Sequence, residues 1–311
     1  MFATQANLFS NAIEHKERAL TQLDAFEFDQ AWDSLEVAKE IDPYLADLEV
    51  LAATCQFARY AGAHARMSVT KAAELWHLTN AAYHAGTLPA AAAMQMRQLL
   101  ARRLLTGRFT ETLFAGAAEK ILHRGVCHLA LAHWQEAHRD LLDLATAHPD
   151  LARPVHWGYL GDAAYALKRW KDANLAYIRL LFTEAYEVDL LSLQHVNLRQ
   201  ILRRLSLEND DAVTMKGLWP FYAWRDNAIE IPAGNTFLLA LAKRSRSLLG
   251  GKLMLERKDA LQQFMLCLYI DQSQLQKEIA FDVRAEMQGL EPELFAEYLA
   301  EVERRRRAVQ R

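Results

Sequence analysis

Histidine offers the clearest potential for chemistry in this sequence of 311 residues, because six of its 11 histidines fall between positions 123 and 156. Four of them, His123, His128, His133 and His138, recur at intervals of five. Imidazole is a common zinc ligand, but on a continuous helix this spacing turns each side chain by about 140° from the last, so the four would spiral around the helix. Neither a Cys-x2-Cys nor a His-Glu-x2-His motif accompanies them. We therefore predict helix-surface or groove histidines and no metal site.

Other reactive side chains lack the neighbours that catalysis requires. The three cysteines are odd in number and widely spaced in apolar runs, which is typical of reduced thiols. The acidic pair Asp210 and Asp211 lies in a polar stretch without the burial that tunes a catalytic pKa. The LLGGK stretch at residues 248–252 lacks the spacing and the final Lys-Ser/Thr of a phosphate loop. We expect neither a cofactor nor enzymatic activity.

Charge gives no reason to expect a nucleic acid or a membrane as the partner. The chain has 36 basic and 39 acidic residues, a formal net charge of -3, and therefore no overall field that attracts phosphates. Its basic stretches at 243–246 and 304–307 are short and typical of solvated helix faces. The first 20 residues show no basic segment followed by an apolar one, and nowhere do about 18 uncharged apolar residues run together. We expect a soluble, cytoplasmic protein.

Helices must position whatever site the chain has, and an internal pattern predicts how they pair. Leu, Ala, Gln, Glu and Arg dominate, and only 12 Gly and 7 Pro interrupt the helices. Trp157, Leu160, Gly161, Ala173 and Tyr177 form a pattern in which two small residues mark the crossing of two helices. The larger residues then fill the space on either side. We predict a closely packed helix pair here.

The same frame recurs upstream, 36 residues earlier and again near the start of the chain. A proline, which cannot continue a helix, closes both of these copies. The copies are Gly125, Trp134, Ala137, Leu141 and Pro149; Ala19, Phe28, Ala31, Leu35 and Pro43; and a weaker one at Trp76, Tyr83, Ala92 and Met96.

With these residues the chain resembles the tetratricopeptide repeat family, whose units are helix-turn-helix pairs. The copies are divergent. Their offset of 36 residues is longer than the usual repeat, Ala164 stands where a tyrosine is expected, and Ala185 stands where a proline would close the last unit. The resemblance implies an all-α fold, a right-handed helix-turn-helix solenoid, capped by the run 190–205, whose concave groove binds a segment of another protein. The groove residues that it implies are Gly158, Asp162 and Tyr165 in the last unit, and His123, Val126 and Leu129 in the preceding one.

The repeat frame is lost beyond a polar break at residues 208–211. We therefore predict a repeat domain at 1–210, an aromatic-rich linker at 211–235 and a mostly helical region at 236–311. The aromatic residues of the linker would either pack it onto the end of the solenoid or clamp a ligand. The candidates for such a clamp are Trp219, Tyr222 and Trp224.

Three functions stay open at this point. The first is a scaffold or adaptor that binds a peptide or helical segment of a partner protein in the groove. The second is an enzyme with a site between the solenoid and the carboxy-terminal region, near residues 219–225 and the histidines. The third, a nucleic-acid-binding regulator acting through its Arg-rich helices, requires steep salt dependence. The absence of catalytic motifs favours the first.

Overall fold

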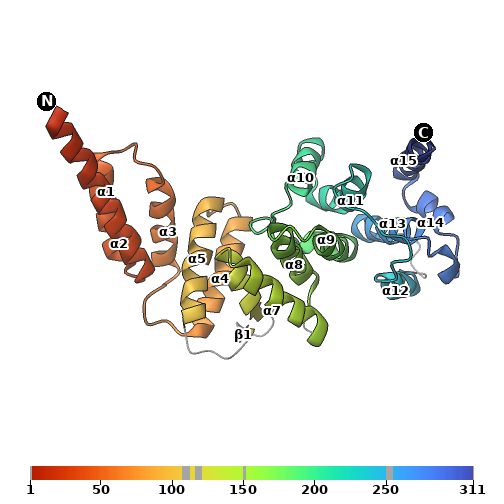
Figure 1. Ribbon diagram of the computed structural model, residues 1–311, viewed down its shortest axis with the longest axis horizontal. Coiled ribbons are helices and arrows are strands. Elements are labelled where there is room, and N and C mark those ends of the chain that lie inside the picture. The colour runs from red at the N-terminus through yellow and green to blue at the C-terminus, as the bar shows by residue number, and fades with distance from the viewer. Residues whose placement is uncertain (1, 107–112, 116–120, 150–151, 250–254, 311) are drawn as a thin grey trace. The chain divides into compact units, whose positions relative to one another are not determined.

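The fold is almost entirely α-helical, with one short antiparallel pair of strands in the part of the chain that is described (Figure 1). This confirms the predicted all-α class. Contacts within the computed structural model divide the chain into two compact units, Met1–Asp140 and Leu141–Arg311. None of the described helices is long and apolar enough to cross a membrane. The structure describes residues 2–106, 113–115, 121–149, 152–249 and 255–310.

The amino-terminal unit, Met1–Asp140, is built mainly of paired helices. Its elements are α1 (Phe2–Asp24), α2 (Phe28–Ile41), α3 (Leu48–Tyr60), α4 (Val69–His84), α5 (Ala90–Thr106), β1 (Leu113–Ala115), β2 (Ile121–His123) and α6 (Arg124–Ala130). Helix α1 packs along α2, and α4 packs along α5 (Figure 1). Helix α3 contacts both α2 and α5, and α6 also contacts α5. The division between the units falls within α7 (Trp134–Ala147).

The carboxy-terminal unit, Leu141–Arg311, is organised around one buried helix. Its elements are α8 (Pro154–Ala166), α9 (Trp170–Glu184), the 3-10 turn η1 (Ala185–Glu187), α10 (Val196–Glu208), α11 (Ala212–Arg225), α12 (Leu239–Leu249), α13 (Arg257–Gln272), the 3-10 turn η2 (Gln276–Glu278), α14 (Val283–Leu290) and α15 (Pro292–Val309). Helix α13 contacts α9, α11, α12 and α14. Its run from Gln263 to Asp271 is buried on every face, as expected of a helix at the centre of a core.

The predicted linker at 211–235 is a helix over much of its length. Pro220 lies inside α11, where a proline costs about 3 kcal/mol. Trp219, Phe221 and Trp224 are fully buried, and burial of such side chains contributes about 2 kcal/mol each, which offsets that cost. The predicted division near residue 210 also does not separate two cores, because α13 packs against both α9 and α11.

The first helix of each of the three clear copies ends in the same backbone turn. A residue seven positions after the first small residue adopts a left-handed conformation, and the next N–H donates to the carbonyl five residues back, as in a Schellman motif. The second helix begins one residue later. The left-handed residues are Phe26 (φ 61°), Ala132 (φ 57°) and Lys168 (φ 59°); the bonds run from Glu27 to Gln22, from His133 to His128 and from Arg169 to Ala164; the second helices begin at Phe28, Trp134 and Trp170.

This turn changes the interpretation of the histidine run. The rotation of about 140° per step applies to one continuous helix. The chain instead leaves α6 after Ala130, turns at Ala132 and enters α7 at Trp134. His128 and His133 therefore lie on opposite sides of a tight turn and face each other instead of spiralling apart.

Gly161→Ala tests the close approach of α8 and α9. A Cβ at Gly161 would lie 2.9 Å from ring carbons of the fully buried Tyr177, so we expect a loss of about 1–3 kcal/mol in the free energy of unfolding. Gly289→Ala in α14 is the matched control, because its Cβ would meet nothing within 4 Å. A methyl group there is expected to be neutral or to stabilise the helix by up to about 1 kcal/mol. Urea unfolding that shows equal effects for both variants would contradict this packing.

Candidate functional site

Two of the predicted groove residues face the second helix of their own pair. A Cβ at Gly158 would lie 2.9 Å from Cδ2 of Leu180 on α9. The carboxylate of Asp162 accepts a hydrogen bond of 2.6 Å from the hydroxyl of Tyr177, also on α9, and Asp162 is fully buried. Gly158 and Asp162 therefore belong to the α8–α9 interface and do not line an open groove.

The three predicted groove residues near α6 are also interior. Val126 and Leu129 are buried on α6. His123 is buried at the start of this helix, where its Nδ1 accepts a hydrogen bond of 3.1 Å from the N–H of Gly125. Such a capping contact satisfies a helix N–H that has no partner within the helix. Of the six predicted groove residues, Tyr165 alone is partly accessible.

The predicted aromatic clamp is not formed. Trp219 is buried and donates its Nε1–H to the carbonyl of Leu198 at 3.1 Å. Trp224 is buried beneath the guanidinium of Arg305, which lies 4.3 Å from the ring centre. Tyr222 remains partly accessible at the surface. Burial of both tryptophans in one core takes them out of reach of a ligand.

An exposed aromatic surface lies instead at the turn between α8 and α9. Trp170, the first residue of α9, is 56% exposed. Its ring meets that of Tyr165 edge-on, with ring centres 5.0 Å apart and planes at 76°. Tyr165 also contacts the imidazole of His195, with ring centres 4.7 Å apart. We call these three residues the aromatic surface. The repeat pattern carries no signal for the exposure of Trp170, and His195 lies outside the pattern.

Two aspartates hold the segment 188–195 that carries His195 to this surface. The Oδ1 atom of Asp162 accepts a hydrogen bond of 2.8 Å from the N–H of Gln194. Asp189 accepts hydrogen bonds from the hydroxyl of Tyr159 at 2.9 Å and from the hydroxyl of Ser192 at 3.0 Å. The segment is therefore tied at both ends, and the position of His195 follows from buried contacts.

Burial sets the charge state of the groups behind this surface. It raises the pKa of the Asp162 carboxyl well above its usual range, although the hydrogen bonds from Tyr177 and Gln194 act in the opposite direction. Burial also lowers the pKa of His195, whose Nδ1 accepts a hydrogen bond of 3.3 Å from the N–H of Leu198. A neutral imidazole is required for that bond. Burial and this hydrogen bond both favour the neutral form of His195.

Basic residues flank the exposed tryptophan in the sequence. Lys168, Arg169 and Lys171 are all exposed and lie within two residues of Trp170. Asp172 is the nearest exposed acid along the chain. The sequence around the tryptophan is therefore locally positive, although the whole chain has a formal net charge of -3.

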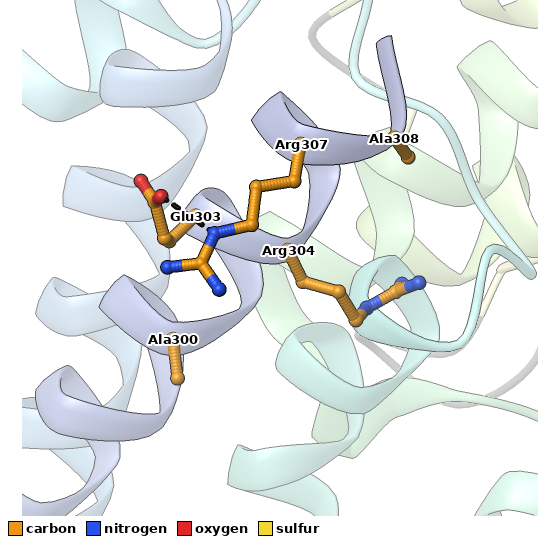
Figure 2. A pocket seen from close by; sticks show the side chains of 5 residues that line it. All are labelled: Ala300, Glu303, Arg304, Arg307 and Ala308. Carbon is orange, nitrogen blue, oxygen red and sulfur yellow. Dashed lines mark hydrogen bonds and ion pairs between the residues drawn. The ribbon is translucent and has the colours of Figure 1, made fainter. Parts of the chain in front are cut away.

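A pocket of about 500 Å³ lies along α15, and its described lining comes from this helix alone. Figure 2 shows the five side chains that line it. Arg307 is paired there with Glu303 at 2.9 Å, and Arg304 is paired with Glu301 at 2.6 Å. Arg305 donates to the carbonyl of Trp224 at 2.6 Å and so caps the end of α11. These arginines form ion pairs and hydrogen bonds with other residues of the chain. The lining residues are Ala300, Glu303, Arg304, Arg307 and Ala308.

The cysteines offer no exposed nucleophile. Cys55, Cys127 and Cys267 are all buried and free. Burial raises the pKa of the Cys55 thiol to about 11, and it raises the pKa of Cys127 further. A thiol with a raised pKa is a poor nucleophile at neutral pH.

Asp162→Asn tests the buried carboxyl. Because the pKa is raised in the folded state, the wild type loses stability as the pH rises from the unfolded carboxyl value of about 4 through the folded value. Asparagine keeps the accepting Oδ1 and has no titrating group. We expect the free energy of unfolding of the variant, relative to the wild type, to increase over this pH range. The exposed Asp172→Asn is the control, and a difference for Asp162→Asn that stays constant with pH would contradict the assignment.

Comparisons of the chain with protein-family models, with curated proteins and with solved structures find no match.

Proposed function

We propose that this chain is a helix-hairpin repeat protein, of the kind that tetratricopeptide repeats represent, and that it binds a segment of a partner protein as a scaffold or adaptor. The aromatic surface of Tyr165, Trp170 and His195 is the contact site. The observation that carries this proposal is the exposure of Trp170, of which 56% is accessible, in ring contact with a positioned tyrosine.

The shared turn supports the repeat interpretation. Three copies have the left-handed residue, the hydrogen bond across five residues and the aromatic start of the second helix at identical offsets. Both small positions of each copy are buried, as a close crossing of two helices requires. A helical solenoid is the arrangement that such units form when they stack.

The aromatic surface supports protein binding because a large exposed aromatic side chain gains more from being covered than most surface residues do. Tryptophan and tyrosine are enriched among the residues that dominate binding energies at protein interfaces. Tyr165 is held by Trp170 and His195, and His195 by the anchored segment 188–195, so little conformational freedom is lost when a partner binds.

The partner segment is proposed to combine an apolar side chain with acidic ones. Lys168 and Lys171 flank the tryptophan and would meet carboxylates at the rim of the contact. Complementary charge at a rim mainly accelerates association and selects among partners. An apolar side chain would cover the ring of Trp170.

In the described part of the chain, no specific feature favours the enzyme or the nucleic-acid alternative. The aromatic residues near 219–225 that would line an enzyme site include the buried Trp219 and Trp224. The arginines 304, 305 and 307 are engaged with Glu301, Glu303 or the backbone of α11.

Trp170→Ala tests the proposal. Peptides from a random library displayed on phage are selected on the full chain, and the affinities of the enriched peptides are measured by isothermal titration calorimetry. We expect these peptides to pair an apolar residue with Asp or Glu. Truncation of a central aromatic typically costs about 2 kcal/mol, so Trp170→Ala should weaken binding about 30-fold.

Tyr44→Ala is the matched control, because Tyr44 is an aromatic residue that is 95% exposed and belongs to the other unit. It should leave binding unchanged. Lys168→Glu should weaken binding and reduce its dependence on salt. Selected peptides that bind the wild type, Trp170→Ala and Tyr44→Ala equally well would reject the aromatic surface as the contact site.

A further inference from the structure

The turn between α6 and α7 brings two histidine nitrogens together. His133 donates its backbone N–H to the carbonyl of His128 at 2.9 Å, which closes the turn. The side chains follow the backbone, and the Nδ1 atom of His128 lies 3.4 Å from the Nδ1 atom of His133. His133 is exposed and the side chain of His128 is 16% exposed, so solvent reaches the pair.

This separation is the one that a tetrahedral metal ion imposes on two of its nitrogen ligands. Bonds of about 2.0–2.1 Å at the tetrahedral angle place two nitrogens about 3.3–3.4 Å apart. Bonds of the same length at right angles would place them about 2.9 Å apart. The observed 3.4 Å therefore fits a tetrahedral ion such as zinc better than an octahedral one.

The second nitrogen of His128 faces a carboxylate. Its Nε2 lies 3.8 Å from Oδ2 of Asp140, within ion-pair range. When a histidine binds a metal through one ring nitrogen, the other carries the proton and usually points to a carboxylate or a carbonyl, which fixes the tautomer and the ring orientation. Asp140 is in the position to do this for His128.

Asp140 is itself held in its ionised form. Its Oδ2 accepts a hydrogen bond of 2.7 Å from Arg124, and its Oδ1 accepts one of 3.1 Å from Arg139. Burial raises the pKa of this carboxyl, but the two arginines outweigh burial and leave the pKa below its usual value. Glu136, exposed in the first turn of α7, adds a second negative charge close to His128. Asp140 and Glu136 therefore favour a positive charge at His128, and Arg124 opposes it.

We propose that His128 and His133 bind a divalent transition-metal ion, zinc or a similar ion, through their Nδ1 atoms, with Asp140 orienting His128. Among the residues that the structure describes, no group of three or more His, Cys, Asp or Glu side chains is placed to hold a metal. The ion therefore takes two protein ligands and completes its coordination with water. This site is independent of the aromatic surface, which lies in the other unit.

Titration of the chelator-treated full chain with zinc chloride tests the site. Isothermal titration calorimetry is expected to show saturable binding at the pair, and cobalt(II) chloride is expected to give the strong visible absorption of a tetrahedral complex. His133→Gln should weaken zinc binding at least about tenfold, the size of effect seen when metal sites lose a supporting group. It should also abolish the cobalt band.

His64→Gln is the matched control, since His64 is an exposed histidine of the same unit. It should leave both titrations unchanged. His133 is exposed, and circular dichroism checks that both variants are folded. His128→Gln provides a second loss of one ligand. Equal zinc affinity in the wild type and in folded His133→Gln, or the absence of a tetrahedral cobalt band, would overturn the proposal and leave the pair as an N–H···N hydrogen bond.

Discussion

One backbone constraint recurs in the three copies of the sequence pattern: a residue other than glycine in the left-handed conformation, seven positions after the first small residue. Phe26, Ala132 and Lys168 all adopt it, at a cost of about 1–2 kcal/mol each. Two backbone hydrogen bonds close each turn, and the small residues on either side let the helices approach. Because the turn is fixed, residues that precede it by a few positions are held against residues that follow it.

The same turn produces different surfaces in different copies. In the third copy the residues four and nine positions after the small residue are Tyr165 and Trp170, and both are at least partly accessible. In the first copy the equivalent residues are Leu23 and Phe28, and both are buried. In the second copy the equivalent residues are the buried Leu129 and the partly accessible Trp134. His128 and His133, each one position earlier, stand at the ends of the closing hydrogen bond. The turn therefore brings residues on its two sides together, and side-chain type and burial determine whether they form a core contact, an exposed surface or a histidine pair.

The sequence predicts the elements better than it predicts their exposure. Small residues at a fixed spacing identify the α8–α9 pair, and the prolines at 43 and 149 lie just beyond the ends of α2 and α7. The family resemblance implies that Asp162 lines a groove, yet Tyr177 and Gln194 donate hydrogen bonds to its carboxylate inside the fold. Pro220 and its aromatic neighbours predict a linker when only the local sequence is considered. The α13 core that buries them is distant in sequence, so the local pattern does not indicate it. The convergence of His128 and His133 depends on a left-handed alanine, which no composition rule indicates.

The two aspartates behind the proposed sites differ in the charge that their partners support. Asp140 has two arginine partners and a lowered pKa, so it stays ionised and can hold the proton of a histidine that faces a cation. Asp162 has a hydroxyl and an amide as partners and a raised pKa, so its charge is disfavoured. Lys168 and Lys171 are exposed next to Trp170 and are the charges that the proposed partner would meet. The proposed cation would therefore lie beside a histidine whose second nitrogen faces an ionised carboxylate, and the proposed acidic, apolar segment would meet lysines at the aromatic surface.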